Sequence, residues 1–158
     1  MTKKFTHFDD SGNPNMVDIN DKKDTKRLAI AVGKVVMQKE TLKLINKNKI
    51  KKGDVFQVAN IAGIQGAKKT DNLIPLCHSL PLSYVKISFS SDEKNNCVNI
   101  KAEASLIGKT GVEMEALTAV SISALTIYDM CKSVDKTMKI DSVKLIHKSG
   151  GKTGTFNA

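Results

Sequence analysis

GVEMEALTAVSISALTIYDMCK, residues 111–132, is the stretch that decides how this chain folds. Apolar and small side chains recur at helical spacing along its whole length, which predicts one long, largely buried helix. Glu113 and Glu115 stand at its start, and Asp129 and Lys132 stand at its end. At a rise of about 1.5 Å per residue, Glu115 and Asp129 lie roughly 21 Å apart along the axis. The two acids cannot share one small-molecule pocket within one chain, so the pattern favours a site shared between two copies of the chain.

The charged residues at the two helix ends allow different interpretations. Thr110 and Glu113 match the S/T-x-x-E capping box, so Glu113 is either a helix cap or a site residue. The helix macrodipole disfavours Asp129 near the C-terminal end, although Lys132, one turn on, can offset this as an i,i+3 partner. The pair of Asp129 and Lys132 is therefore the better candidate for a functional role.

Composition narrows the class of protein. The 158 residues include three cysteines without C-x-x-C spacing, and no apolar run is long enough for a membrane span. The first residues also lack the apolar segment of a signal peptide. We therefore expect a cytoplasmic protein with a single domain over residues 1–158, an N-terminal extension over 1–26 and a loose tail over 155–158.

The formal net charge of +9 raises nucleic acid as a partner, because lysine and arginine release counterions from phosphates. However, Arg27 is the single arginine, so bidentate contacts to bases and phosphates are nearly missing. Five Phe, two Tyr and no Trp form no stacking platform. A small basic RNA-binding module remains the alternative, but it requires sheet-face aromatics that the predicted hairpin strands lack. We expect a small anionic ligand and neither a nucleic-acid nor a membrane partner.

The remaining patterns predict an α+β fold. Alternation and helical periodicity indicate strands at 27–37, 83–90, 97–107 and 139–148, and helices at 39–48, 54–69 and 111–132. Asp54 is expected to cap the second helix. The resulting order is the βαββαβ of a ferredoxin-like sandwich, in which helices cover one face of an antiparallel sheet. Apolar residues on the opposite sheet face suggest that a partner subunit covers part of it.

Two Gly-Lys-Thr stretches resemble the end of a phosphate-binding loop. Glu103 and Ile146 occupy the position of the first glycine in G-x-x-x-x-G-K-[ST], so neither stretch is a Walker A motif. Residues 108–111 nevertheless open a helix, and their backbone N–H groups can bind a phosphate or a carboxylate. Residues 148–154 either wrap an anion in a nest or form a flexible tail.

Cys77 and His78 lie in a loop flanked by Pro75 and Pro81. Adjacent Cys and His side chains point in different directions, and no second pair has zinc-like spacing, so we expect no metal held by the protein. His78 is either a general acid or base above the sheet or a buried, hydrogen-bonded histidine.

Four runs of sequence resemble the cyclic pyranopterin monophosphate synthases of molybdenum cofactor biosynthesis. They are HFDDSGNPNMVDI, KKGDVFQVANIAGIQGAKKTDNLIPLCHSLPLS, GKTGVEMEALTAVSISALTIYDMCK and KSGGKTG, and together they span residues 7–154. The resemblance implies a ferredoxin-like homohexamer, a trimer of dimers, with active sites at subunit interfaces. It also implies a lyase that converts 3′,8-cyclo-7,8-dihydro-GTP to cyclic pyranopterin monophosphate with release of pyrophosphate.

The same resemblance implies the site residues. Asp129 of the YDMCK block is the implied catalytic residue, assisted by Lys132 and by Lys52 of the KGD block. Asn60 departs from the pattern, which has an arginine before IAGIQ. No tightly bound cofactor is implied, although Mg²⁺ can accompany the triphosphate of the substrate. The implied substrate-binding residues are Leu76, Cys77, His78, Glu113, Met114, Glu115, Lys68 and Lys148.

These residue types suit the implied reaction, in which a purine-derived ring system is rebuilt and a cyclic phosphate closes. Asp129 and His78 can transfer protons, while Lys52 and Lys132 can act as acids or stabilise developing negative charge. Lys68 and Lys148 can neutralise the triphosphate.

Overall fold

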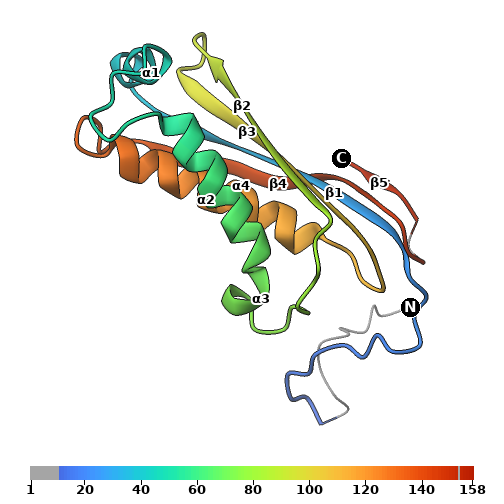
Figure 1. Cartoon of the computed structure of the whole chain (residues 1–158). Coiled ribbons are helices and arrows are strands. Elements are labelled where there is room, and N and C mark those ends of the chain that lie inside the picture. The colour runs from blue at the N-terminus through green and yellow to red at the C-terminus, as the bar shows by residue number, and fades with distance from the viewer. Residues whose placement is uncertain (1–10, 153) are drawn as a thin grey trace.

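The computed structural model describes residues 11–152 and 154–158, which form one antiparallel sheet with helices packed on one face (Figure 1). The strand order is β2-β3-β1-β4-β5. The α+β class and the predicted βαββαβ order are confirmed, with the short α3 and β5 as additions. The strands are β1 (Thr25–Val36), β2 (Tyr84–Asp92), β3 (Cys97–Gly108), β4 (Lys139–Ser149) and β5 (Phe156–Asn157), and the helices are α1 (Lys39–Asn46), α2 (Val55–Lys68), α3 (Thr70–Leu73) and α4 (Glu113–Cys131).

Small side chains on the central strand allow α4 to lie close to the sheet. Ala29, Ala31 and Val35 of β1 are fully buried beneath the helices. Between them, a Cβ added to Gly33 would stand 2.7 Å from Cγ1 of Val120 on α4. Glycine at this position therefore permits a separation between strand and helix that any side chain would increase.

Helices α2 and α4 also pack closely against each other. A Cβ at Gly63 of α2 would collide with Oγ of Ser123 and with Cδ1 of Ile87, and would stand 2.9 Å from the carbonyl of Ala119. The buried Ser123 hydroxyl donates to the carbonyl oxygen of Ala59 at 3.0 Å. This hydrogen bond joins α4 to α2 and helps to fix the orientation of α4, and with it the positions of the charged residues at the two ends of the helix.

The two predicted helix caps have different outcomes. Asp54 caps α2 as predicted, because its Oδ1 accepts from the backbone N–H of Gln57 at 3.1 Å. The capping box before α4 is wrong, since the N-cap residue is Val112 and no side chain caps this end. Glu113 instead forms an ion pair with Lys148 of β4 at 2.9 Å, which competes with the local cap for the same carboxylate.

The loose tail predicted for residues 155–158 is also wrong. Phe156–Asn157 pairs with β4, and the backbone N–H of Ala158 donates to the carbonyl of Ile146 at 3.0 Å. His147 and Asn157 add a side-chain hydrogen bond between Nδ1 and Oδ1 at 2.7 Å. The predicted extension over residues 1–26 is described only from residue 11, and its last two residues already belong to β1.

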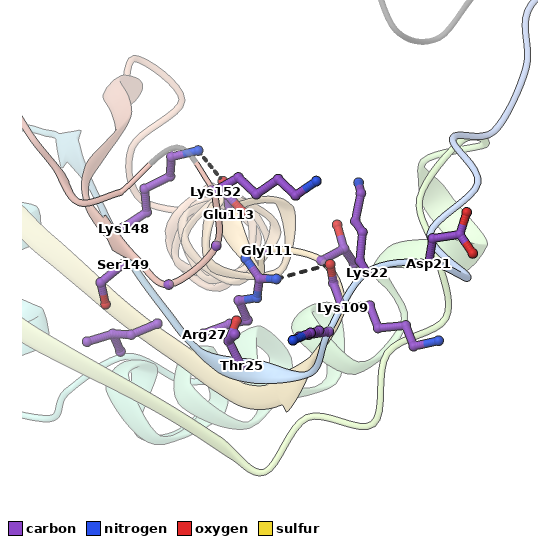
Figure 2. A pocket seen from close by; sticks show the side chains of 15 residues that line it. Asp21, Lys22, Thr25, Arg27, Lys109, Gly111, Glu113, Lys148, Ser149 and Lys152 are labelled. Atoms are coloured by element: carbon purple, nitrogen blue, oxygen red, sulfur yellow. Dashed lines mark hydrogen bonds and ion pairs between the residues drawn. The ribbon is translucent and has the colours of Figure 1, made fainter.

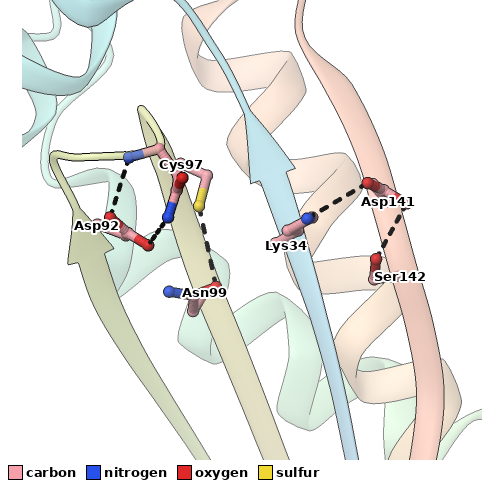
Figure 3. Close-up of polar contacts among 7 residues, drawn as sticks. Lys34, Asp92, Cys97, Asn99, Asp141 and Ser142 are labelled. Atoms are coloured by element: carbon pink, nitrogen blue, oxygen red, sulfur yellow. Dashed lines mark hydrogen bonds and ion pairs between the residues drawn. The ribbon is translucent and has the colours of Figure 1, made fainter.

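The sheet face opposite the helices is uncovered in the single chain. The ion pair of Lys34 and Asp141, with 3.5 Å between Nζ and Oδ2, joins β1 to β4 there (Figure 3). Farther along the same sheet, Asp92 closes the turn between β2 and β3 by accepting from the backbone N–H of Asn95 at 3.0 Å. No helix among the described residues combines the length and the hydrophobicity needed to cross a membrane.

Candidate functional site

The three predicted catalytic residues meet at the C-terminal end of α4. Nζ of Lys52, from the loop before α2, lies 2.9 Å from Oδ2 of Asp129 and 2.8 Å from the carbonyl oxygen of the same residue. Nζ of Lys132 lies 2.7 Å from Oδ1 of Asp129. Each carboxylate oxygen therefore has its own ammonium group. We call these three residues the lysine–aspartate cluster.

The two lysines determine the charge state of this cluster. Hydrogen bonds from Lys132 and then Lys52 lower the pKa of Asp129 to about 2, and the hydrogen bond to Asp129 raises the pKa of Lys132. A carboxylate with so low a pKa is a weak base at neutral pH, and the raised pKa of Lys132 keeps its ammonium group charged. In this geometry Asp129 holds the two lysines in place, and the lysines offer positive charge and N–H hydrogen-bond donors to an incoming anion.

A cavity of about 430 Å³ lies near the opposite end of α4. We call it the carboxylate cavity, because two acids from the first turn of α4 line it. The loop before β2 and the segment before β1 form its other walls. Six of the eight predicted substrate-binding residues line this cavity, namely Leu76, Cys77, His78, Glu113, Met114 and Glu115.

Glu115 is the group in this cavity with the most altered acidity. Its side chain is only 4% exposed, and burial, with smaller contributions from Glu113 and Asp71, raises its pKa to about 7. A carboxyl group with this pKa can donate or accept a proton near neutrality. Burial and the nearby Glu115 also raise the pKa of Cys77, so this cysteine stays a neutral thiol.

His78 is held on one side only. Its Nε2 lies 2.9 Å from the carbonyl oxygen of Val17. A carbonyl oxygen can only accept a hydrogen bond, so Nε2 carries the hydrogen. Nδ1 has no hydrogen-bond partner among the residues that the structure describes, and it is the ring atom that can exchange a proton with a ligand. His78 is therefore half-buried and hydrogen-bonded, and its role as a general acid or base stays a prediction.

A second cavity, of about 730 Å³, adjoins the first and shares Lys22, Thr110, Gly111 and Glu113 with it. Both glycine-rich stretches reach this second cavity, one through residues 109–111 and the other through 148–152 (Figure 2). Asp21 and Glu113 are its only acidic lining residues in the described part of the chain. The basic lining residues are Lys22, Lys23, Arg27, Lys109, Lys148 and Lys152.

This basic cavity brings together stretches that the sequence places far apart. Its excess of cations makes it suited to an anion with several charges. Lys148 lies in its wall as predicted, with its ammonium group paired to Glu113. Residues 148–154 were expected either to wrap an anion or to form a flexible tail. Residues 148–152 of this stretch line the basic cavity, and Thr153 lies outside the described residues.

Not every predicted residue reaches these cavities. Lys68 is exposed in the last turn of α2 and lines neither of them, so its role at the site stays a prediction. Asn60 buries its Oδ1 without a hydrogen-bond partner in the described structure. No three His, Cys, Asp or Glu side chains gather as a metal site in the described ranges.

Arg27 is the residue that the sequence patterns missed, since they assigned it only to a strand. The signal is its position: Arg27 shares the core-facing side of β1 with Ala29 and Ala31, where a lone arginine needs a buried partner. The sequence patterns also missed Lys22 and Lys23, because solvated lysines are common throughout the chain. Lys109 and Lys152 belong to the two Gly-Lys-Thr stretches that were already considered for anion binding.

The fold and cavities define a small α+β protein with a cationic cavity beside a carboxylate cavity, and with a lysine–aspartate cluster at the far end of the connecting helix. Residues 16–151 match the MoaC family, and the chain belongs to this family. The cyclic pyranopterin monophosphate synthase of Chloroflexus aurantiacus is 57% identical over 97% of this chain and 94% of the relative. Those of Natranaerobius thermophilus and Clostridium perfringens are 51% and 52% identical, and the matches cover 98% and 99% of this chain and 97% and 99% of the relatives.

The alternative of an RNA-binding module finds no support. Tyr84 is exposed on the uncovered sheet face, but Phe89 of the same strand turns to the helix side and stacks on Phe56 with ring centroids 5.3 Å apart. Strands β2 and β3, which are described in full, therefore present no pair of aromatics for stacking bases.

Proposed function

We propose that this protein is a cytoplasmic cyclic pyranopterin monophosphate synthase, a lyase that converts 3′,8-cyclo-7,8-dihydro-GTP to cyclic pyranopterin monophosphate and releases pyrophosphate. The observation that carries this proposal is the 57% identity, over nearly the whole chain, to a relative of that name. The two adjoining cavities support it, because the substrate combines a polyphosphate with a ring system that must gain and lose protons.

The charges of the two cavities suggest how the substrate is divided between them. The triphosphate lies in the basic cavity, where lysines and Arg27 balance its charge. The ring system lies in the carboxylate cavity, where Glu115 and Nδ1 of His78 transfer protons. Mg²⁺ enters only as a companion of the triphosphate, because the wall around the phosphates is mostly cationic.

A second chain must bring the lysine–aspartate cluster to these cavities. Met114, Leu125 and Lys132 lie within about 20° of one line along α4, and Asp129 lies beside that line. Leu125 is 54% exposed, and the neighbouring Ile61 of α2 is 60% exposed. Antiparallel packing of two copies along this stripe covers the apolar side chains and brings Asp129 of one chain toward Met114 of the other.

Such a two-fold pair contains two identical composite sites, one at each end of the paired helices. We propose that three pairs form a hexamer, as the family resemblance implies. The uncovered sheet face remains available for contacts between the pairs.

Product analysis tests the proposed reaction. With 3′,8-cyclo-7,8-dihydro-GTP as substrate, we expect pyrophosphate and cyclic pyranopterin monophosphate in equal amounts, because each turnover closes one cyclic phosphate. The first is measured by a coupled phosphate assay and the second as its fluorescent oxidised pterin. Consumption of substrate without either product would refute the proposal.

Subunit mixing tests the composite site. Asp129→Asn disables the cluster, and His78→Ala disables the carboxylate cavity, so a mixed pair keeps one intact site of two. Random exchange at equal concentrations should restore about one quarter of wild-type turnover. Mixing Asp129→Asn with Lys52→Ala is the matched control. Both of those changes disable the cluster, so no mixed pair has an intact site and no recovery is expected. A site within one chain would give no recovery in either mixture once exchange is verified by mass.

A further inference from the structure

Arg27 is the single buried cation among the described residues, with 8% of its surface exposed. Its Nε donates to the carbonyl of Gly108 at 3.0 Å, and its Nη2 donates to the carbonyl of Lys109 at 3.1 Å. One edge of the guanidinium thus holds two consecutive carbonyls of the loop between β3 and α4. A guanidinium group has five N–H donors, so three remain after these contacts.

The opposite side of the guanidinium lies against a pair of glycines. A Cβ on Gly151 would collide with Nη1 of Arg27 and stand 3.1 Å from Cζ, and a Cβ on Gly150 would collide with the carbonyl oxygen of Lys26. The φ angles of Gly150 and Gly151 are +87° and +89°, in the region that favours glycine. Conformation and space therefore both require this glycine pair. Arg27 lies between the two glycine-rich loops that form the basic cavity (Figure 2).

The positive charge of Arg27 has no carboxylate partner in the described part of the chain. Glu113 shares the cavity, but its ion pair is with Lys148. A buried charge that is hydrogen-bonded to neutral carbonyls alone is costly to keep and attracts an anion strongly, since little water screens it. The surrounding lysines add to this field, so the cavity favours a ligand with several negative charges over a single carboxylate.

We propose that Arg27 is a positioning residue for a polyphosphate chain. Arg27 contacts residues 108–109 on one side and residues 150–151 on the other, and so holds these two walls of the basic cavity in place with one fixed charge between them. The proposal rests on the proposed function, because it assigns the triphosphate of that substrate to these walls. Lysine cannot replace Arg27. A single ammonium group lacks the planar fork that contacts two carbonyls on one side and the glycine pair on the other.

The test measures the binding of inorganic triphosphate and, separately, of pyrophosphate by calorimetry at near-physiological salt. Arg27→Lys and Gly151→Ala should each weaken triphosphate binding by about 10-fold to 100-fold and raise KM more than they lower kcat. Gly12→Ala is the matched control. Its φ is +82°, but an added Cβ meets nothing within 4 Å, so its affinity should stay within about 3-fold of wild type. A weaker effect on pyrophosphate than on triphosphate would assign these walls to the substrate and not to the released product.

Two outcomes would overturn the positioning role. One is a folded Arg27→Lys variant that binds triphosphate like wild type. If that variant loses its thermal transition, Gly151→Ala decides the question, and an affinity equal to that of Gly12→Ala would overturn the proposal. The test is separable from the proposed function. Wild-type protein that forms product while Arg27→Lys keeps its affinity rejects only the positioning role, and wild-type protein that binds triphosphate without forming product rejects only the reaction.

Discussion

Replacing Asp129 with asparagine should lower turnover by about 100-fold or more, while the fold and the oligomer size stay unchanged. The substitution removes the negative charge that pairs with Lys52 and Lys132 at 2.9 and 2.7 Å, so both ion pairs of the cluster are lost. The side chain is exposed, and its loss leaves the core intact. Turnover on 3′,8-cyclo-7,8-dihydro-GTP, with the oligomer size from gel filtration, measures the effect.

Asp141 provides a matched control for this prediction. It is another exposed aspartate paired with a lysine, Lys34, but it lies on the uncovered sheet face away from both cavities. Asp141→Asn should keep turnover within about 2-fold of wild type, as is usual for an exposed ion pair. Near wild-type turnover in Asp129→Asn would remove the cluster from the mechanism.

Replacing Glu115 with glutamine should stabilise the protein at alkaline pH and not at acid pH. The pKa of Glu115 rises from 4.5 to about 7 on folding, so between these values the folded state holds a proton that the unfolded chain has released. Stability contributed by this group therefore falls as pH rises from 4.5 to about 7 and stays reduced above that. The shift corresponds to roughly 3 kcal/mol, which Glu115→Gln should recover at pH 8.

Urea unfolding of wild type and Glu115→Gln at pH 4.5, 6 and 8 measures this difference. Glu113→Gln is the matched control, since Glu113 is paired with Lys148 and its loss should not stabilise the protein. Equal stability of wild type and Glu115→Gln at all three values would show that Glu115 ionises normally. Higher stability combined with lower turnover is the pattern of a carboxyl group retained for function.

The long elements could be predicted because their periodicity is local. Residues 111–132 and the two hairpin strands repeat their apolar positions often enough to determine both type and buried face. Helix α3 has four residues, and β5 has two residues that depend on pairing with β4, so neither carries a period of its own. The failed capping box has a similar cause, since Glu113 is drawn to a lysine 35 positions away.

The site residues show the same difference: those with contacts close in sequence could be predicted, and those with distant contacts could not. The pair of Asp129 and Lys132 could be predicted because an i,i+3 contact lies within one helix turn. The role of Arg27 could not, because the carbonyls it binds are 81 and 82 positions away. The substrate-binding role of Lys68 remains a prediction. It comes from the family resemblance alone, since no spacing or motif within the chain indicates it.

The length of helix α4 sets the distance between the lysine–aspartate cluster and the carboxylate cavity. One inserted residue would turn Asp129 by about 100° away from the Met114 stripe, and two inserted turns would restore the direction but move Asp129 about 11 Å too far. In the proposed two-fold pair both composite sites would use this same length, so one error would misalign both at once. A substitution at the exposed Leu125 can be absorbed by repacking, whereas insertions and deletions within α4 cannot. We therefore expect α4 to tolerate a substitution at Leu125 and not a change in its length.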